Sequence, residues 1–247
     1  MEFDVITLFP HMFDPVFNCS VMGRAREKDL FKLRIYNLRD FTENRHKTVD
    51  DYPFGGGRGM VLKPDPIWNS VESICNNFKT EKSKIILMSP MGKVFNHTMA
   101  MELSQLDQMI LICGHYEGVD ERVREYLVDD EISIGDYILS GGELPAMVII
   151  ESIVRLIPGV LPEESVKTDS FYSSILSFPQ YTRPGNFKGY EVPQVLISGH
   201  HEAVRKWRRT KAIERTLVCR PDLLNNLELT DEDKKIIVEI NERQVLN

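Results

Sequence analysis

The sequence predicts an α/β fold with a mostly parallel sheet flanked by helices, followed by a small all-helical C-terminal domain. Two observations predict it. In the first two thirds of the chain, short runs rich in Ile, Val and Leu alternate with longer helix-like stretches, as in parallel strands joined by crossover helices. After Pro158 the alternation stops, and a polar stretch leads into a segment punctuated by Pro and Gly and then into helical patterns.

Five apolar runs have the length and composition of strands, and most of them end at Pro, Gly or Ser. In chain order they are Asp4–Phe9, Phe31–Tyr36, Lys84–Met88, Met109–Cys113 and Glu131–Ile134. The helix-like stretches are Asp14–Lys28, Pro66–Phe78, Asn96–Gln105, Val119–Leu127 and Gly142–Leu156. Together these elements predict a first domain over residues 1–160.

Residues 161–177 are polar, follow a Pro-Gly pair and lack periodicity, so they are predicted to be an interdomain linker. A helical domain is predicted for residues 178–247, with helices over His200–Thr216 and Asp231–Gln244. Thr230 and Asp233 have the spacing of a capping box at the start of the second helix, because a hydroxyl and a carboxylate three residues apart can bond each other's backbone amides.

The composition is that of a globular cytoplasmic protein. With 42% hydrophobic and 27% charged residues, the 247-residue chain is not expected to be mainly disordered or fibrous. The four cysteines form no CxxC pair, and Cys75 and Cys113 are expected to be buried thiols, as in a reducing cytosol. The first ten residues do not resemble a signal peptide, and no apolar run reaches the roughly 20 residues that span a bilayer.

Three of the predicted strands run into unusual loops, Ser89–Gly92, Gly114–Gly118 and Ser133–Gly142. Glycine lets a backbone approach a ligand closely, and ligands of parallel sheets bind beyond the carboxyl ends of the strands. Any one loop could be only a tight turn, but the three together predict a pocket of main-chain groups suited to a purine nucleoside. No GxxxxGK[ST] and no strand-to-helix GxGxxG occurs, which disfavours a Walker-type NTPase and an ordinary dinucleotide fold.

A separate glycine-rich segment, Asp51–Gly59, lies outside any strand-to-helix turn. Two interpretations stay open for it. The segment could close over a substrate or contact a phosphate through Arg58, or it could be a surface loop without a function.

The charge is distributed unevenly. The net charge of −7 by itself argues against a nucleic-acid partner, yet residues 180–220 carry nine basic and three acidic side chains, a net charge of +6. Arg205, Arg208 and Arg209 share one helix face by their i, i+3 and i+4 spacing, which predicts contact with a phosphate backbone. A solvated helix face is the alternative. His200 and His201 are adjacent in the predicted helix and about 100° apart around it, which disfavours a shared metal ion.

Seven motifs follow one another over nearly the whole chain: DVITLFP, PFGGGRGMVLKPDPI, MSPMGKVF, CGHYEGVDERV, ISIGDYILSGGELPAMVIIESIVRLIPGVL, YTRP and EVPQVLISGHHEAVRKWR. Together they closely resemble the bacterial tRNA (guanine-N1-)-methyltransferase (TrmD) family. The resemblance implies a SPOUT fold with a trefoil-knotted sheet, a rare exception to the rule that chains are unknotted. It also implies an obligate homodimer with its active sites at the subunit interface.

The implied reaction is transfer of a methyl group from S-adenosylmethionine to N1 of guanosine 37, 3′ of the anticodon, in tRNAs with G at positions 36 and 37. The resemblance also links activity to Mg²⁺, for which the sequence offers no clear set of ligands. Asp169 matches the general base of the family, and Arg155 matches the residue that stabilises charge on guanine O6. The chain departs from the family at Ser177, where many relatives carry an acid.

By motif match, the cofactor site is formed by the three loops described above and the strand ends before them. Its implied residues are Leu87, Ser89, Pro90, Gly114, Tyr116, Glu117, Gly118, Ser133, Ile134, Gly135, Tyr137, Leu139, Gly141, Gly142 and Pro145. The predicted substrate-binding residues are Arg58, Arg183, His200, His201, Arg205, Arg208 and Arg209.

Two other functions stay open. One is a catalytically silent RNA-binding protein on the same scaffold, which the retention of Asp169 and Arg155 disfavours. The other is a knotted methyltransferase with a different target, such as a ribose 2′-hydroxyl of ribosomal RNA, which the basic C-terminal helices and the YTRP motif disfavour.

Overall fold

The structure, a computed structural model, describes residues 1–78 and 80–245, and the chain divides into two compact units, Met1–Pro162 and Glu163–Asn247. Residues 246–247 of the predicted C-terminal domain lie outside the described residues. Residues 163–177, most of the predicted linker, group with the second unit and include helix α7 (Glu163–Thr168).

The first unit is built on a five-stranded sheet in which every neighbouring pair is parallel, with the order β2-β1-β6-β5-β7. Its strands are β1 (Glu2–Thr7), β2 (Lys32–Asn37), β5 (Ser83–Val94), β6 (Gln108–Cys113) and β7 (Asp130–Ser133). All five predicted strands and their parallel arrangement are therefore confirmed. The central strand β6 is buried along its whole length, which explains its continuous apolar sequence.

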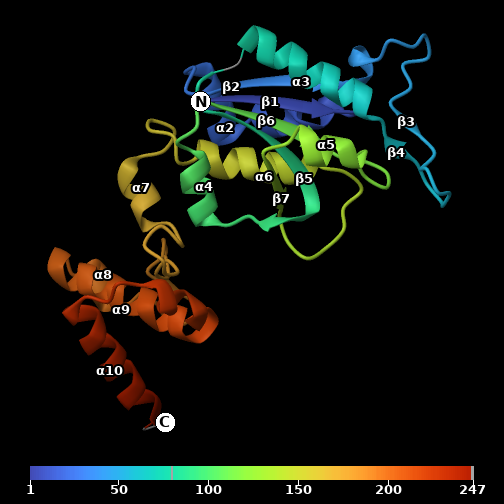
Figure 1. Ribbon diagram of the computed structural model, residues 1–247. Helices are drawn as coiled ribbons and strands as arrows, with labels where there is room; N and C mark the ends of the chain where they lie inside the picture. The colour runs from blue at the N-terminus through green and yellow to red at the C-terminus, as the bar shows by residue number, and fades with distance from the viewer. Residues whose placement is uncertain (79, 246–247) are drawn as a thin grey trace. The chain divides into compact units, whose positions relative to one another are not determined.

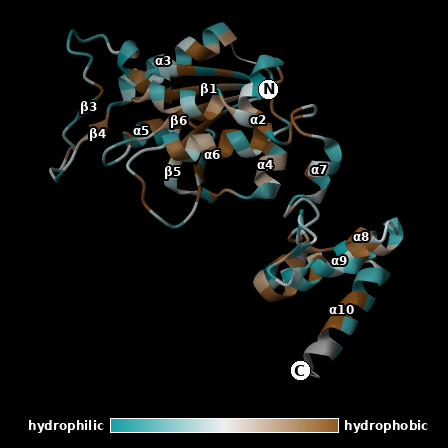
Figure 2. Cartoon of the chain, turned by 180° about the vertical axis from the view of Figure 1, so that it is seen from behind, coloured by the Kyte–Doolittle hydropathy of each residue, from teal (hydrophilic) through white to brown (hydrophobic). Residues whose placement is uncertain are grey.

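Helices cover both faces of this sheet (Figure 1). One face packs against α1 (Asp14–Phe17), α2 (Ser20–Glu27), α4 (His97–Leu103) and α6 (Glu143–Val154). The other packs against α3 (Pro64–Phe78) and α5 (Glu121–Tyr126). Because side chains alternate along a strand, Phe3 and Val5 join the first cluster and Ile6 joins the second. Apolar residues are correspondingly dense on the strands and on α6 (Figure 2).

The predicted single helix over Asp14–Lys28 is wrong, because the chain turns between α1 and α2. Ser20 has a φ of 52°, and a Cβ atom on Gly23 would lie 2.8 Å from the carbonyl oxygen of Asn18. The break therefore depends on a glycine that lets the second helix approach the end of the first. Other short elements were not predicted: the 3₁₀ turns η1 (Pro10–Met12) and η2 (Leu38–Phe41), and the pair β3 (Asp50–Asp51) and β4 (Val61–Leu62), which flanks the glycine-rich segment.

The second unit is mainly helical, with α8 (Gln194–Ile197), α9 (His201–Cys219), η3 (Pro221–Asn226) and α10 (Asp231–Val245). It also contains a small hairpin of β8 (Asn186–Phe187) and β9 (Tyr190–Glu191), which corrects the expectation of an all-helical domain. Ile213 of α9 packs against Ile236 and Ile240 of α10 in the core of this unit.

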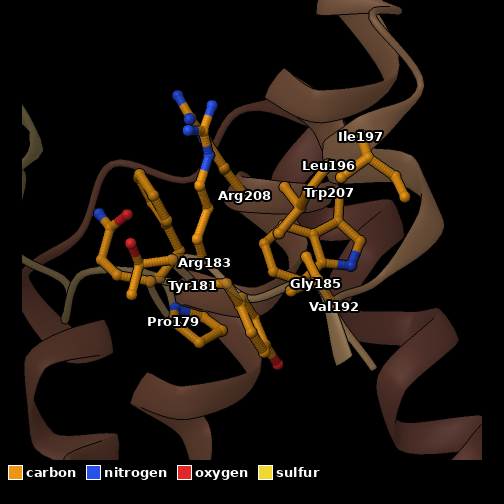
Figure 3. Close-up of a pocket in the computed structure, with 12 residues that line it drawn as sticks. Pro179, Tyr181, Arg183, Gly185, Val192, Leu196, Ile197, Trp207 and Arg208 are labelled. Atoms are coloured by element: carbon orange, nitrogen blue, oxygen red, sulfur yellow. The ribbon is translucent and has the colours of Figure 1, made fainter. Parts of the chain in front are cut away.

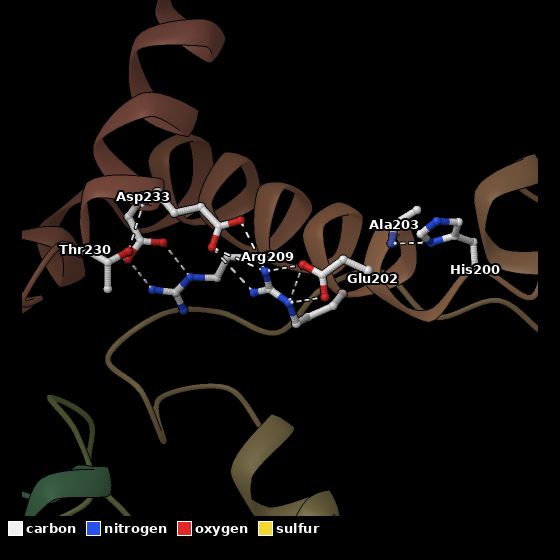
Figure 4. A network of polar contacts seen from close by, with 8 residues as sticks. His200, Glu202, Ala203, Arg209, Thr230 and Asp233 are labelled. Atoms are coloured by element: carbon white, nitrogen blue, oxygen red, sulfur yellow. Dashed lines mark hydrogen bonds and ion pairs between the residues drawn. The ribbon is translucent and has the colours of Figure 1, made fainter.

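The start of α10 is fixed by the predicted capping box. The Asp233 amide donates to the Thr230 hydroxyl, and the Thr230 amide donates to the Asp233 carboxylate, each at 3.1 Å. The same carboxylate accepts two bonds from the Arg209 guanidinium of α9, at 2.7 and 2.8 Å (Figure 4). The Asp233 side chain is only 2% exposed, and these bonds, above all those from Arg209, lower its pKa from 3.8 to about 2. Arg209 thus ties α9 to α10.

This ion pair predicts a pH-dependent contribution to stability. Because the pKa of Asp233 is lower in the folded chain than in the unfolded chain, the contribution is present above pH 3.8 and lost as the pH falls toward 2. We expect Asp233→Asn to lower the unfolding free energy of the second unit by roughly 2 kcal/mol at pH 6, and this deficit to shrink below pH 4. Denaturant unfolding in a Trp68→Phe background, followed by the fluorescence of Trp207, measures it.

The matched control is Asp222→Asn. Asp222 also forms a two-bond pair with Arg220, at 2.8 and 2.6 Å, but its side chain is 57% exposed. Exposed pairs contribute little, so this variant should unfold almost like the parent chain. Equal effects of the two substitutions would contradict the role given to the Arg209–Asp233 pair.

Candidate active site

A pocket of about 510 Å³ lies beyond the carboxyl ends of β6 and β7 and beside the middle of β5, and it contains every residue predicted to bind the cofactor. The predicted loop Ser89–Gly92 is corrected, because these residues belong to β5, whose pairing with β7 shifts register between Met88 and Lys93. The other two predicted loops line the pocket as loops.

Nine further residues line the pocket, and three of them, Val119, Glu121 and Arg124, lie in α5 or just before it. The other six are Met88, Met91, His115, Ile132, Ile138 and Ser140. The sequence could have indicated these six by position, since each lies directly beside a matched residue in the chain.

Glycines allow the backbone segments that line this pocket to pack closely against the sheet. The Gly142 amide donates to the Gly114 carbonyl at 2.9 Å. A Cβ atom at Gly142 would lie 2.7 Å from the Cα atom of Cys113, closer than real contacts allow. Gly118 and Gly135 have φ values of 119° and 144°, which strain any residue with a side chain. These glycines therefore allow main chain to approach the pocket closely, as the sequence predicted for a nucleoside site.

Two buried polar side chains are hydrogen-bonded to each other next to Gly142, a residue that lines the pocket. The Thr7 hydroxyl at the end of β1 donates to the carboxylate of Glu143, the first residue of α6, at 2.7 Å, and both side chains are buried. Burial, helped by the charge of Glu143, raises the pKa of the Cys113 thiol well above its usual value. Cys113 is thus a protonated core residue and a poor nucleophile. Its predicted burial is confirmed, whereas Cys75 is only half-buried.

The glycine-rich segment is tied to the loop Gly114–Gly118. The Glu117 amide donates to the Met60 carbonyl and the Leu62 amide to the Gly118 carbonyl, both at 3.0 Å. A side chain on Gly59 would collide with the carboxylate of Glu117. The exposed Arg58 therefore lies in a segment whose C-terminal end is hydrogen-bonded to the loop Gly114–Gly118, which lines the pocket.

A second pocket, of about 390 Å³, lies within the second unit. Asp169, directly after α7, lines it together with Ser177, Phe178 and basic side chains from α9. Ser177 is hydrogen-bonded to Ser170. The Ser177 amide donates to the Ser170 hydroxyl at 2.9 Å, and the two hydroxyl oxygens are 3.2 Å apart. The basic side chains lining the pocket are Lys167, His201, Arg205, Arg208 and Arg209.

The three arginines that share one face of α9 have different partners. Arg205 pairs with Glu202 at 2.7 Å and Glu232 at 3.5 Å, and its hydrogen bond lowers the pKa of Glu202. Arg209 pairs with Asp233, as described above. Arg208 instead lies over the ring of Phe178, 4.8 Å from its centroid. The Phe178 ring is uncharged and leaves the charge of Arg208 in place, whereas the buried Asp233 carboxylate neutralises Arg209, so we assign Arg209 a structural role.

The two histidines are not equivalent. His200 precedes α9 and caps it, with its Nδ1 atom accepting the Ala203 amide at 3.2 Å (Figure 4). The expectation that both lie within the helix is therefore corrected. His201 is the first residue of α9 and lines the pocket of Asp169.

Arg155 caps the carboxyl end of α6 in the first unit, with its amide bonded to the Glu151 carbonyl at 3.1 Å. Asp169 belongs to the second unit. Because the two residues are in different units, their joint action on one guanine stays a prediction.

Within residues 1–78 and 80–245, no group of three or more His, Cys, Asp or Glu side chains is placed to hold a metal ion. No helix in these same residues is both long and apolar enough to cross a membrane.

A parallel α/β unit with a glycine-lined pocket beside its strands, followed by a mainly helical unit whose residues 180–220 carry a net charge of +6, is the architecture of a ligand-binding α/β protein. The model of the family described as tRNA (Guanine-1)-methyltransferase TrmD matches residues 1–226. The chain belongs to this family of methyltransferase enzymes, which confirms the resemblance drawn from its motifs.

Similar proteins come from diverse bacteria, and each is named tRNA (guanine-N(1)-)-methyltransferase. The relative from Dictyoglomus turgidum is 52% identical over 241 residues, which cover 97% of this chain and 96% of the relative. The relative from Moorella thermoacetica is 52% identical over 245 residues, covering 99% and 98%. The relative from Staphylococcus aureus strain JH9 is 53% identical over 238 residues, covering 96% of each chain.

Proposed function

We propose that this protein transfers the methyl group of S-adenosylmethionine to N1 of guanosine 37 in tRNAs with G at positions 36 and 37. One observation carries the proposal. All residues implied by the motifs to hold the cofactor, from three separate segments of the chain, line a single pocket, and family membership gives that pocket its reaction class.

The pocket fits the cofactor by size and chemistry. Ligand pockets for molecules of this size measure about 300–1,000 Å³, and main-chain donors and acceptors suit the ribose and the purine. Gly114, Gly141 and Gly142 bring the backbone close, while Tyr116 and Leu139 add apolar surface. When bound, the cofactor supplies a methyl carbon made electrophilic by the attached sulfonium.

Asp169 acts as the general base in this proposal. The neutral guanine carries a proton on N1 and has no reactive lone pair there, so the proton must leave as the new bond forms. The Asp169 carboxylate accepts this proton. This leaves a lone pair on N1 available for the methyl group that the bound cofactor would supply.

Arg155 stabilises the negative charge that develops on guanine O6 as N1 loses its proton, a role of the oxyanion-hole type. The Asp169 pocket in the second unit, with Arg208 and His201 in its wall, receives the guanine. Arg58 and Arg183 contact RNA phosphates on this proposal. Arg205 contributes less, because Glu202 and Glu232 offset its charge.

We also propose a homodimer with a trefoil-knotted sheet, acting in the cytoplasm. Large apolar side chains are exposed on neighbouring elements of the first unit, namely Met91 and Val94 of β5, Met101 of α4, and Leu144 and Val148 of α6. Such exposure is typical of an association surface. The close approaches at Gly92 to β7 and at Gly142 to β6 are those required where one chain segment passes tightly against another. Sedimentation at micromolar concentration distinguishes a dimer from a monomer.

The test is incubation with methyl-labelled S-adenosylmethionine and separate pools of tRNA and ribosomal RNA. We expect label in tRNA only and, after nuclease digestion, 1-methylguanosine identified by mass. A tRNA with A in place of G at position 37 is the matched control and should stay unlabelled. Label confined to ribosomal RNA, or no label at all, would refute the proposal in favour of a ribose methyltransferase or a silent RNA-binding protein.

A further inference from the structure

The second unit has another pocket, of about 310 Å³, which the proposed chemistry does not use (Figure 3). It is formed by the segment before the β8–β9 hairpin, by α8 and by one face of α9. Tyr181 and Trp207 contribute aromatic rings whose centroids are 6.3 Å apart and whose planes are tilted by 56°. Val192, Leu196 and Ile197 complete the apolar lining.

Cations border this aromatic surface. Arg183 and Arg208 line the pocket, and the Arg208 guanidinium lies over the Phe178 ring, 4.8 Å from its centroid. Tyr181 is half exposed, so a flat ligand can reach its ring. Aromatic rings beside arginines recur where single-stranded nucleic acids bind, because bases stack on the rings and phosphates pair with the cations.

The position of this pocket identifies its occupant. Phe178 and Arg208 line both this pocket and the pocket that contains Asp169, so the two are neighbours with a shared wall. A guanine unstacked into the Asp169 pocket leaves the adjacent nucleotide without its stacking partner. We propose that the pocket of Tyr181 and Trp207 binds this adjacent nucleobase of the substrate RNA by stacking, an inference that rests on the proposed function.

Base stacking on an aromatic ring contributes about 1–3 kcal/mol, and 1.4 kcal/mol is a tenfold change in affinity, so Trp207→Leu should weaken RNA binding roughly 5- to 140-fold. Trp207→Phe keeps a stacking surface and should stay close to the parent protein. Tyr190→Leu removes an aromatic side chain outside the pocket, 80% exposed on β9, and serves as the matched control with unchanged affinity.

The probes are an RNA hairpin of the anticodon arm containing the reacting guanine, and two hairpins in which the nucleotide 5′ or 3′ of that guanine is abasic. We expect one abasic hairpin to bind the parent protein and Trp207→Leu equally, because the base that stacks is already missing. If Trp207→Leu lowered the affinity for all three hairpins by the same factor, the proposal would be overturned. Unchanged affinity for the intact hairpin in both Trp207→Leu and Tyr181→Leu would also overturn it.

Fluorescence gives a second measurement on a folded protein with the pocket intact. The chain has two tryptophans, and in a Trp68→Phe background the emission comes from Trp207 alone. The intact hairpin should quench the Trp207 emission. The abasic hairpin that binds the parent protein and Trp207→Leu equally should not quench it. Equal quenching by all three hairpins would overturn the proposal. Identification of the methylated nucleoside does not depend on these binding measurements. Absence of 1-methylguanosine would refute the proposed function, whereas the comparison of intact and abasic hairpins tests the stacking site.

Discussion

We expect that replacing Asp169 by Asn will abolish most methyl transfer while leaving the cofactor bound. The amide has nearly the shape of the carboxylate but cannot accept a proton, so we expect the single-turnover rate to fall by about 100- to 10,000-fold, the usual contribution of a general base. Cofactor affinity should not change, because the predicted cofactor residues line a pocket within Met1–Pro162. Rapid-quench kinetics and calorimetric titration of the cofactor measure the two quantities.

Glu164→Gln is the matched control for this experiment. Its carboxylate is five residues earlier, is 88% exposed and interacts with Lys167 at 3.8 Å. The variant should retain full activity. If Asp169→Asn were as active as Glu164→Gln, the proton of guanine N1 would have another acceptor, and the mechanism proposed above would be wrong.

The second large effect is expected at Gly142. In Gly142→Ala, the new methyl group would lie 2.7 Å from the Cα atom of Cys113 and 3.0 Å from the Gly114 amide nitrogen, and neither backbone atom can rotate away. Overpacking of this kind costs about 1–3 kcal/mol and can cost more where the backbone is involved. The loop must move outward, so the pocket should lose cofactor affinity at least tenfold together with the loss of stability.

Gly114→Ala is the steric control for stability. It belongs to the same pocket, but its added methyl group would find its nearest neighbours at 3.7 and 3.8 Å, which is ordinary van der Waals contact. Thermal unfolding should therefore distinguish the two variants, with Gly142→Ala melting lower. Matching melting temperatures would show that the loop at Gly142 relaxes without cost, contrary to the expectation.

Much of the first unit could be predicted because its signals are local. A run such as Met109–Cys113 is apolar at every position, and a strand buried on both faces needs no other information. Two of the glycine loops could be predicted equally well, since they follow the carboxyl ends of β6 and β7, where ligands of parallel sheets bind. The third, Ser89–Gly92, is part of β5, because its backbone pairs on toward β7 after a register shift that the sequence does not reveal. The turn between α1 and α2 was missed, because it depends on close packing of Gly23 against Asn18 and not on periodicity.

The second unit was harder to predict, because its side chains are decided by neighbours distant in the sequence. Spacing alone placed Arg205, Arg208 and Arg209 on one basic face. It could not show that Asp233, 24 residues after Arg209, is buried against it, or that Phe178 lies beneath Arg208. Nor could it show that Tyr181 and Trp207 line a common pocket.

The sequence by itself determined the parallel α/β layers, two loops of the pocket and the family, because strand and helix periods and long motifs are properties of consecutive residues. Only the tertiary structure decided which charges remain available to a ligand. A cation is neutralised by whatever carboxylate the fold brings within a few ångströms, and that pairing depends on how α9 and α10 pack, which no local pattern of residues encodes.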